Sequence, residues 1–155
     1  MDLASTTSDQ GSSLLIVEDG IDLTVIGDLD YVNARPTKAI TAQDALDALR
    51  LAVGLDTTSG SKDAFSYIAA DFNQSGKVTA QDALEILKYA VGLEGQDAEW
   101  KFFDSDGDYS GISRSNTNFD EGITAQNIAT NLDMSMTGIL LGDVNDTFTS
   151  YLEVM

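Results

Sequence analysis

Apolar side chains recur every three or four residues in two segments of the chain, and this spacing places them on one face of a helix. The pattern predicts helices near residues 42–53 and 80–91. We expect their apolar faces to form the core: Leu46, Leu49 and Val53 in the first helix, and Leu84, Leu87 and Val91 in the second.

Elsewhere the pattern is shorter or less periodic. A further helix is expected near 62–70, a short one near 124–131, and an apolar strand or helix at 134–141. Apolar runs at 14–17 and 21–26 predict a short β hairpin. The expected fold is therefore mainly α, with paired loop–helix repeats, long irregular loops and a short N-terminal β segment. Residues 1–26 would form a flexible start with the hairpin, and residues 27–155 one compact unit.

The two strongest helical segments belong to an internal repeat. Residues 41–55 align without gaps on residues 79–93, with 11 identities in 15 positions. Thr41 and Thr79 are suited to cap the helices, with Asp44 and Asp82 three residues later. A third, weaker copy is Ile123-Thr-Ala-Gln-Asn127, which we interpret as a structural relic.

The loop before the second helix has the spacing of an EF-hand calcium loop. Oxygen-bearing side chains stand at positions 1, 3, 5, 9 and 12 of the segment 71–82, with Gly76 at position 6. A hard cation prefers six to eight oxygens at roughly 2.3–2.6 Å, so the chain must wrap tightly around it. The candidate ligands are Asp71, Asn73, Ser75, the carbonyl of Lys77, and Asp82. A polar turn followed by a capped helix is the simpler alternative.

Two such units in tandem, with Asp rather than Glu at position 12, resemble the type I dockerin family. The resemblance is carried by residues 71–93 and 41–55 and spans about residues 27–93. The repeated Thr-Ala-Gln-Asp-Ala-Leu units and Gly142-Asp-Val-Asn145 also resemble dockerin-like ends of large secreted or surface-attached bacterial proteins. The resemblance implies a non-catalytic module ordered by Ca²⁺, secreted or on the cell surface, with a cohesin-like or other surface protein as partner.

The first repeat departs from this pattern. Counting back from Asp44 places Arg35 at position 3, and a guanidinium cannot accept a hydrogen bond or bind a cation. An expanded loop, opened by Asp28 and Asp30 and closed by Asp44, would restore a site. The alternative is a first half without metal.

A third acidic patch comprises Asp104, Asp106 and Asp108. Its alternating carboxylates suit calcium, but no acid follows at position 12. A third calcium site and a solvated loop both fit this patch. We therefore expect two Ca²⁺ sites and treat the patch as a third candidate.

Composition narrows the function further. The 155 residues carry a formal net charge of −18, which disfavours nucleic acid and anionic membranes as partners. The chain has no Cys and no His, which excludes thiolate and imidazole chemistry. The longest wholly apolar run, residues 14–17, is too short to span a bilayer. We expect no enzymatic activity.

The alternative function is a C-terminal export and folding module of a secreted bacterial protein that uses Ca²⁺ only for stability. If the module binds a partner, the outward faces of the two repeated helices are the expected surface. With the leucine stripes placed inward, four residues would lie outside: Arg50, Leu51, Lys88 and Tyr89.

Overall fold

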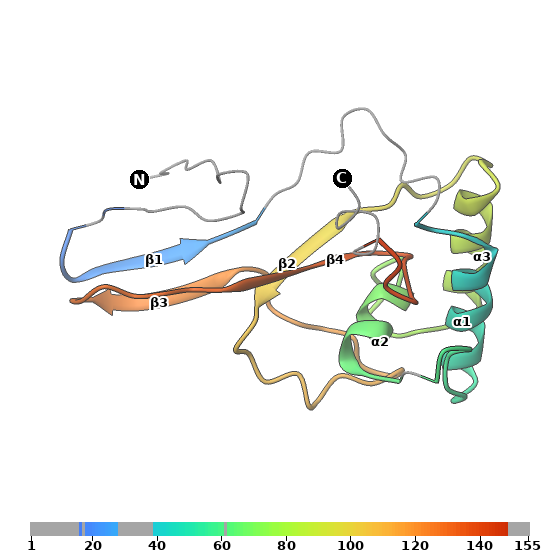
Figure 1. The fold of residues 1–155 in the computed structure, drawn as a ribbon, viewed down its shortest axis with the longest axis horizontal. Helices are drawn as coiled ribbons and strands as arrows, with labels where there is room; N and C mark the ends of the chain where they lie inside the picture. The colour runs from blue at the N-terminus through green and yellow to red at the C-terminus, as the bar shows by residue number, and fades with distance from the viewer. Residues whose placement is uncertain (1–15, 17, 28–38, 61, 149–155) are drawn as a thin grey trace.

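The computed structural model describes residue 16 and residues 18–27, 39–60 and 62–148. It contains three helices, α1 (Ala42–Ala52), α2 (Ala64–Ala70) and α3 (Ala80–Ala90). It also contains four strands: β1 (Ile21–Val25), β2 (Trp100–Asp104), β3 (Ile123–Ile128) and β4 (Met136–Leu140). The helices gather at one end of the molecule, and the pair β1–β3 reaches away from them (Figure 1). None of the helices in these ranges is long and apolar enough to cross a membrane.

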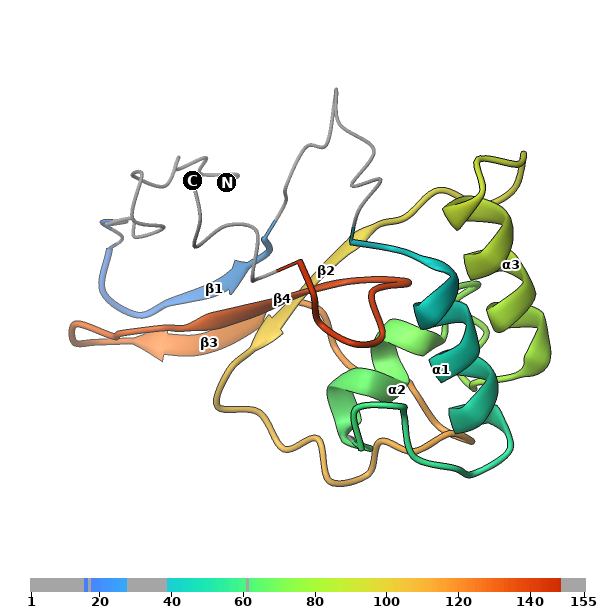
Figure 2. The ribbon, with the colours of Figure 1, turned by 45° about the vertical axis from the view of Figure 1, so that its right-hand side comes forward.

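The predicted helices of the two repeats are confirmed, and their ends follow from local chemistry. At the start of α1, Asp44 Oδ2 accepts the Thr41 amide at 2.9 Å, and at the start of α3, Asp82 Oδ2 accepts the Thr79 amide at 2.8 Å. Each threonine hydroxyl in turn accepts backbone N–H groups of the first turn. The two helices pack side by side (Figure 2).

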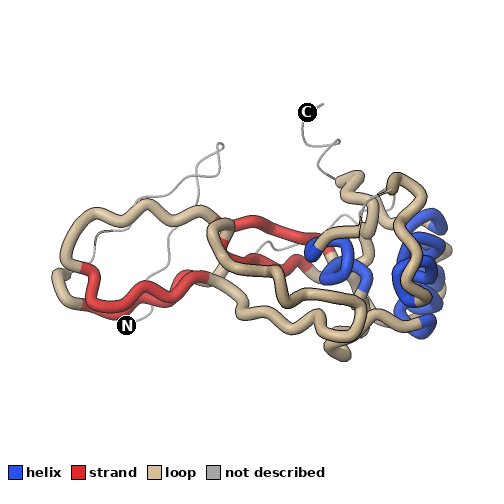
Figure 3. Tube along the Cα trace, turned by 90° about the horizontal axis from the view of Figure 1, so that it is seen from below, coloured by secondary structure: helices blue, strands red, loops and turns tan. Residues whose placement is uncertain are grey.

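The strands form two separate antiparallel pairs, β1 with β3 and β2 with β4. In the second pair, Trp100 lies opposite Leu140 and Asp104 opposite Met136. The prediction of a mainly α fold is wrong, because the described chain after α3 forms strands and the fold is mixed α/β. Figure 3 shows the β1–β3 pair at the end opposite α1 and α3, with the β2–β4 pair between them, next to α2.

The predicted N-terminal hairpin also needs correction. Strand β1 pairs with β3, so that Val25 lies opposite Ile123. The strand therefore joins the N-terminal segment to a segment almost one hundred residues away. Residues 14, 15 and 17 lie outside the described part of the chain.

The short helix expected near 124–131 is wrong, because the third repeat copy is a strand. Ile123 to Ile128 forms β3, although the same Ile-Thr-Ala-Gln sequence at residues 40–43 leads into α1, which begins at Ala42. The third copy has Asn127 where the others have Asp, and lacks the Ala-Leu run that follows them. Asn127 has a positive φ of 49° and its amide donates to Asp22 of β1 at 2.8 Å. Strand pairing therefore replaces helix propagation.

The leucine stripes of α1 and α3 face outward, opposite to the sequence prediction. Leu46, Leu49 and Val53 are 46%, 42% and 62% exposed, and Leu84, Leu87 and Val91 are 47%, 40% and 59% exposed. Instead Ala48 and Leu51 of α1 and Ile86 of α3 are fully buried.

The burial of Asp44 and Asp82 explains which face of each helix turns inward. Asp44 lies on the same helical face as Ala48 and Leu51, and Asp82 on the same face as Ile86. Both aspartates are fully buried, so each helix must turn this face inward. The leucines, about half a turn away, are left at the surface.

Candidate metal centre

Asp71 begins a tightly wound loop where α2 ends. Its Oδ1 accepts the amide of Ser75 at 2.9 Å and its Oδ2 accepts the amide of Gly76 at 2.8 Å. Gln74 and Gly76 have positive φ values of 56° and 87°. The left-handed turn at Gly76 favours glycine because a side chain there would be strained. The loop thus folds back on its first carboxylate.

The five predicted ligands of this loop lie together. Ser75 Oγ is 3.4 Å from Asp71 Oδ1 and 3.2 Å from the Lys77 carbonyl oxygen. Oxygens bound at right angles to Ca²⁺, each about 2.4 Å from the ion, would be about 3.4 Å apart. Asp82 closes the arrangement, because its Oδ1 accepts the Asn73 amide at 3.1 Å. The spacing of these oxygens suits a hard cation.

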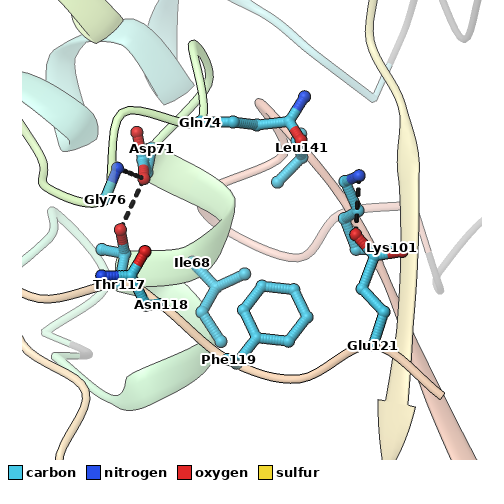
Figure 4. A pocket seen from close by; sticks show the side chains of 10 residues that line it. All are labelled: Ile68, Asp71, Gln74, Gly76, Lys101, Thr117, Asn118, Phe119, Glu121 and Leu141. Carbon is cyan, nitrogen blue, oxygen red and sulfur yellow. Dashed lines mark hydrogen bonds and ion pairs between the residues drawn. The ribbon is translucent and has the colours of Figure 1, made fainter.

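A segment that the sequence did not single out packs against this loop. The Thr117 hydroxyl donates to Asp71 Oδ2, and its amide donates to the Gly76 carbonyl at 3.0 Å. Figure 4 shows Thr117 and Gly76 on either side of Asp71, in a pocket whose far wall carries the Lys101–Glu121 ion pair at 2.8 Å. Lys101 is therefore occupied by Glu121, away from the candidate ligands.

The segment that follows β4 has the same local geometry as the Asp71 loop. Asp143 Oδ1 accepts the amide of Thr147 at 3.0 Å and its Oδ2 accepts the amide of Phe148 at 2.8 Å. Asp146 has a positive φ of 54°, matching Gln74 at the fourth position. The sequence Asp143-Val-Asn-Asp-Thr147 also repeats the residue types of Asp71-Phe-Asn-Gln-Ser75 at positions 1, 3 and 5.

This segment lies against the start of α1, as the Asp71 loop lies against the start of α3. The amide of Asn145 donates to Asp44 Oδ1 at 3.2 Å, as that of Asn73 does to Asp82 Oδ1. The Thr147 hydroxyl is 3.1 Å from Asp143 Oδ1 and 3.1 Å from the Ala39 carbonyl oxygen. Sequence reasoning noted residues 142–145 but did not identify them as candidate ligands, and the Asp-x-Asn-x-Thr spacing was the available signal.

The carboxylates of both arrangements are buried. Asp44 and Asp82 are 0% exposed, and Asp71 and Asp143 are 5% exposed. Among the described residues, none of these four forms an ion pair with a lysine or arginine. Burial raises the pKa of Asp44 above its usual value, against hydrogen bonds from Thr41 and Asn145, and the nearby Asp143 charge raises it further. A cation at either place would offset this desolvation and repulsion.

Neither arrangement relies on a cluster of three acids. Within the described ranges, no group of three or more Asp, Glu, His or Cys side chains is placed to hold a metal. Each arrangement instead combines two carboxylates with amide, hydroxyl and carbonyl oxygens. Calcium accepts such mixed oxygen donors, whereas zinc and copper favour nitrogen or sulfur.

Other candidate ligands are placed differently. Asp28 and Asp30 lie outside the described residues. Asp104 ends β2, Asp106 and Asp108 lie in the turn that follows, and the three do not form a group placed to hold a metal. Asp104 Oδ1 accepts the Asp106 amide at 2.9 Å, and hydrogen bonds from Ser110 lower the pKa of Asp108. The turn thus supplies local hydrogen-bond donors to the carboxylates of Asp104 and Asp108.

The predicted partner surface is partly wrong. Leu51 is fully buried, and Tyr89 is half-buried against Phe72, with ring centroids 6.0 Å apart. Arg50 Nε donates to the Asp56 carbonyl at 2.7 Å, and Lys88 pairs with Glu85 at 3.0 Å. These side chains do not form a joint outward face because the helix phase is reversed.

The outward face of the helix pair is apolar instead. A groove between α1 and α3 is lined only by alanine and leucine side chains: Ala42, Ala45, Leu46, Leu49, Ala80, Ala83, Leu84 and Leu87. The repeat places equivalent residues on its two sides. Four leucines, each 40–47% exposed, make this a contiguous apolar surface.

Comparison with known proteins returns no match: no family model, no curated protein and no solved structure resembles this chain significantly.

Proposed function

We propose that the chain is a non-catalytic, dockerin-like Ca²⁺-binding module of a secreted or cell-surface protein. It folds on Ca²⁺ and mediates a protein–protein interaction or surface anchoring. The observation that carries the proposal is the loop 71–82, where the Ser75 hydroxyl oxygen lies 3.4 Å from Asp71 Oδ1 and 3.2 Å from the Lys77 carbonyl oxygen. Asp82, fully buried, closes this loop from the first turn of α3.

The chemistry of the donors favours Ca²⁺ over metals that prefer nitrogen or sulfur ligands, such as zinc and copper. Every candidate ligand is an oxygen, and the sequence has no His or Cys. The donors are also wound around one point by the Asp71–Ser75 and Asp71–Gly76 hydrogen bonds, so binding requires little rearrangement. Because the metal binds only the folded loop, its binding free energy stabilises the fold.

The interaction part of the proposal rests on the groove between α1 and α3. Exposed apolar patches on soluble proteins often mark interaction sites. The occupant we propose is a cohesin-like or other surface protein that presents an apolar patch to the four groove leucines. A module that used Ca²⁺ only for stability would need no such partner.

Calorimetric titration with Ca²⁺ tests the metal. Asp71→Asn keeps the side-chain shape and removes a ligand charge, so we expect one binding event to weaken at least tenfold. Asp133→Asn is the matched control, because Asp133 is exposed and lies in the connection between β3 and β4. Absence of Ca²⁺ binding by the unaltered protein would reject the proposal.

The partner is tested with the double variant Leu49→Gln, Leu87→Gln against the control Leu132→Gln, which alters a leucine 52% exposed elsewhere. Capture of a surface protein should require Ca²⁺, survive the control and be lost in the double variant. If purified protein binds Ca²⁺ but the double variant captures the same protein equally well, the groove is not the interface.

A further inference from the structure

We propose that a second Ca²⁺ site is assembled from two distant segments of the chain, the start of α1 and the segment that follows β4. Its ligands are Asp143, Asn145 and Thr147 of the C-terminal segment, together with the Ala39 carbonyl and Asp44. This deepens the proposed function and rests on it, since both sites take the same cation. It differs from the expanded loop predicted from the sequence, in which Asp28 and Asp30 open the site.

The first support is an atom-by-atom correspondence with the loop 71–82. Asp143 accepts two amides four and five residues ahead, as Asp71 does. Thr147 Oγ1 lies 3.1 Å from both Asp143 Oδ1 and the Ala39 carbonyl, where Ser75 Oγ lies 3.4 and 3.2 Å from its counterparts.

The sequence register agrees with this geometry. Ala39 stands five residues before Asp44, as Lys77 stands five before Asp82. Position 7 of the split site is therefore the carbonyl of Ala39, and position 12 is Asp44. Positions 1, 3 and 5 come from the other end of the chain.

A second, independent observation concerns the side chain of Asn145. Asn145 Oδ1 is buried and has no hydrogen-bond partner. A buried polar atom without a partner is costly, so such atoms are rare in native structures. Asn145 stands at position 3, whose side-chain oxygen is a ligand in loops of this type. A bound Ca²⁺ would supply the missing partner.

The hydrophobic core holds together the two segments that form the split site, residues 39–44 and 143–147. Val144 and Ile40 are 2% and 1% exposed. Gly142, with φ of 95°, lies so close to both loops that a Cβ atom would be 3.0 Å from Phe72 and 3.1 Å from Ile40. The segment therefore reaches α1 through the same core that supports the contiguous loop.

The split also explains the residue at position 6. The contiguous loop needs Gly76 there because its chain must turn sharply to supply the next ligand. In the split site the next ligand comes from Ala39, so the chain need not turn, and Phe148 occupies the position. Phe148 packs edge-on against Trp100 with ring centroids 4.9 Å apart.

As a consequence, one Ca²⁺ ion would link Asp44 and Asn145, which are 101 residues apart in sequence. Ca²⁺ at this site would tie α1 to the segment after β4, and so restrain the whole intervening chain. Trp100 is the only tryptophan and packs against Phe148. Its fluorescence should therefore change when Ca²⁺ binds the split site.

The experiment is Ca²⁺ titration of the full chain, followed by calorimetry and by Trp100 fluorescence. We expect two bound ions. Asn145→Ala and Asp143→Asn should each weaken one site at least tenfold and reduce the Trp100 response, while the site containing Asp71 remains. Asp146→Asn removes a charge at the non-ligand position 4 of the same segment and should leave both ions bound.

The outcomes separate the two proposals. No Ca²⁺ binding at all rejects the proposed function. One bound ion, lost in Asp71→Asn and unaffected by Asp143→Asn and Asn145→Ala, rejects the split site alone. Two bound ions with the second lost in Asp28→Asn, but not in Asn145→Ala, would assign it to the expanded loop instead. Because Asn145→Ala alters no charge, it keeps the test valid if Asp143→Asn fails to fold.

Discussion

The Asp71 loop and the Asp143 segment share a local geometry but differ in how the chain reaches it. Between Asp71 and Asp82 eleven peptide bonds hold all the candidate ligands near one another. Between Asn145 and Asp44 the separation is 101 residues, and only the folded core brings them together. A contiguous loop can order locally around an ion, whereas a split site exists only when the whole domain is folded. Calcium at the second place should therefore be coupled more strongly to global stability.

Removing calcium should have the largest effect on both regions. An ion at 100 times its dissociation constant stabilises the folded state by about 2.7 kcal/mol, so two ions give about 5.4 kcal/mol. For a chain of this size we expect chelator to lower the melting temperature by roughly 10–20 °C. Differential scanning calorimetry with and without EDTA measures this. An unchanged melting temperature would contradict calcium-coupled folding.

The buried residue at position 2 of each region gives the next comparison. Phe72→Ala should destabilise the protein by about 3–5 kcal/mol, because Phe72 is 0% exposed and its removal leaves a cavity. Val144→Ala removes less volume and should cost about 2 kcal/mol. Urea unfolding in saturating Ca²⁺ measures both. A near-neutral Val144→Ala would mean that the C-terminal segment is not anchored in the core.

Variants of Asp44 and Asp82 test whether Ca²⁺ at each site stabilises only the nearby loop or the whole domain. Asp44→Ala and Asp82→Ala each remove the N3 carboxylate of a capping box, which costs about 1 kcal/mol without metal. With Ca²⁺ present we expect Asp44→Ala to increase proteolytic cleavage near the C terminus, whereas Asp82→Ala should not. Limited proteolysis with mass analysis of the fragments tests this difference. Equal cleavage in the two variants would show that the regions respond alike.

The hydroxyl ligands should show the smallest effect. Ser75→Ala and Thr147→Val each remove one neutral oxygen from a candidate shell, and also one hydrogen bond worth about 1 kcal/mol. We expect each to weaken only its own site, by about tenfold or less. Calorimetric titration resolves the two events. If Thr147→Val altered neither event, Thr147 would be a structural residue of the turn.

Several elements followed from the sequence because their causes are local. The Thr-x-x-Asp capping boxes and left-handed glycines at 54 and 92 bound α1 and α3. The Asp71 loop could be predicted as a candidate site because its candidate ligands lie within twelve consecutive residues. The sequence also indicated which face of each helix is buried, through Asp44 and Asp82. A carboxylate that packs against a buried loop must face inward, even where the leucine spacing predicts the opposite face.

Three features were decided only by tertiary structure. Ile-Thr-Ala-Gln leads into helix α1 at residues 40–43 but begins strand β3 at residue 123, because β1 supplies a pairing partner there. The leucines of α1 and α3 face outward because Asp44 and Asp82 take the inner face. The pairing of residues 143–147 with Ala39 and Asp44 depends on packing between distant segments. No local spacing encodes such a contact, since its stability comes from a core that exists only after the chain has folded.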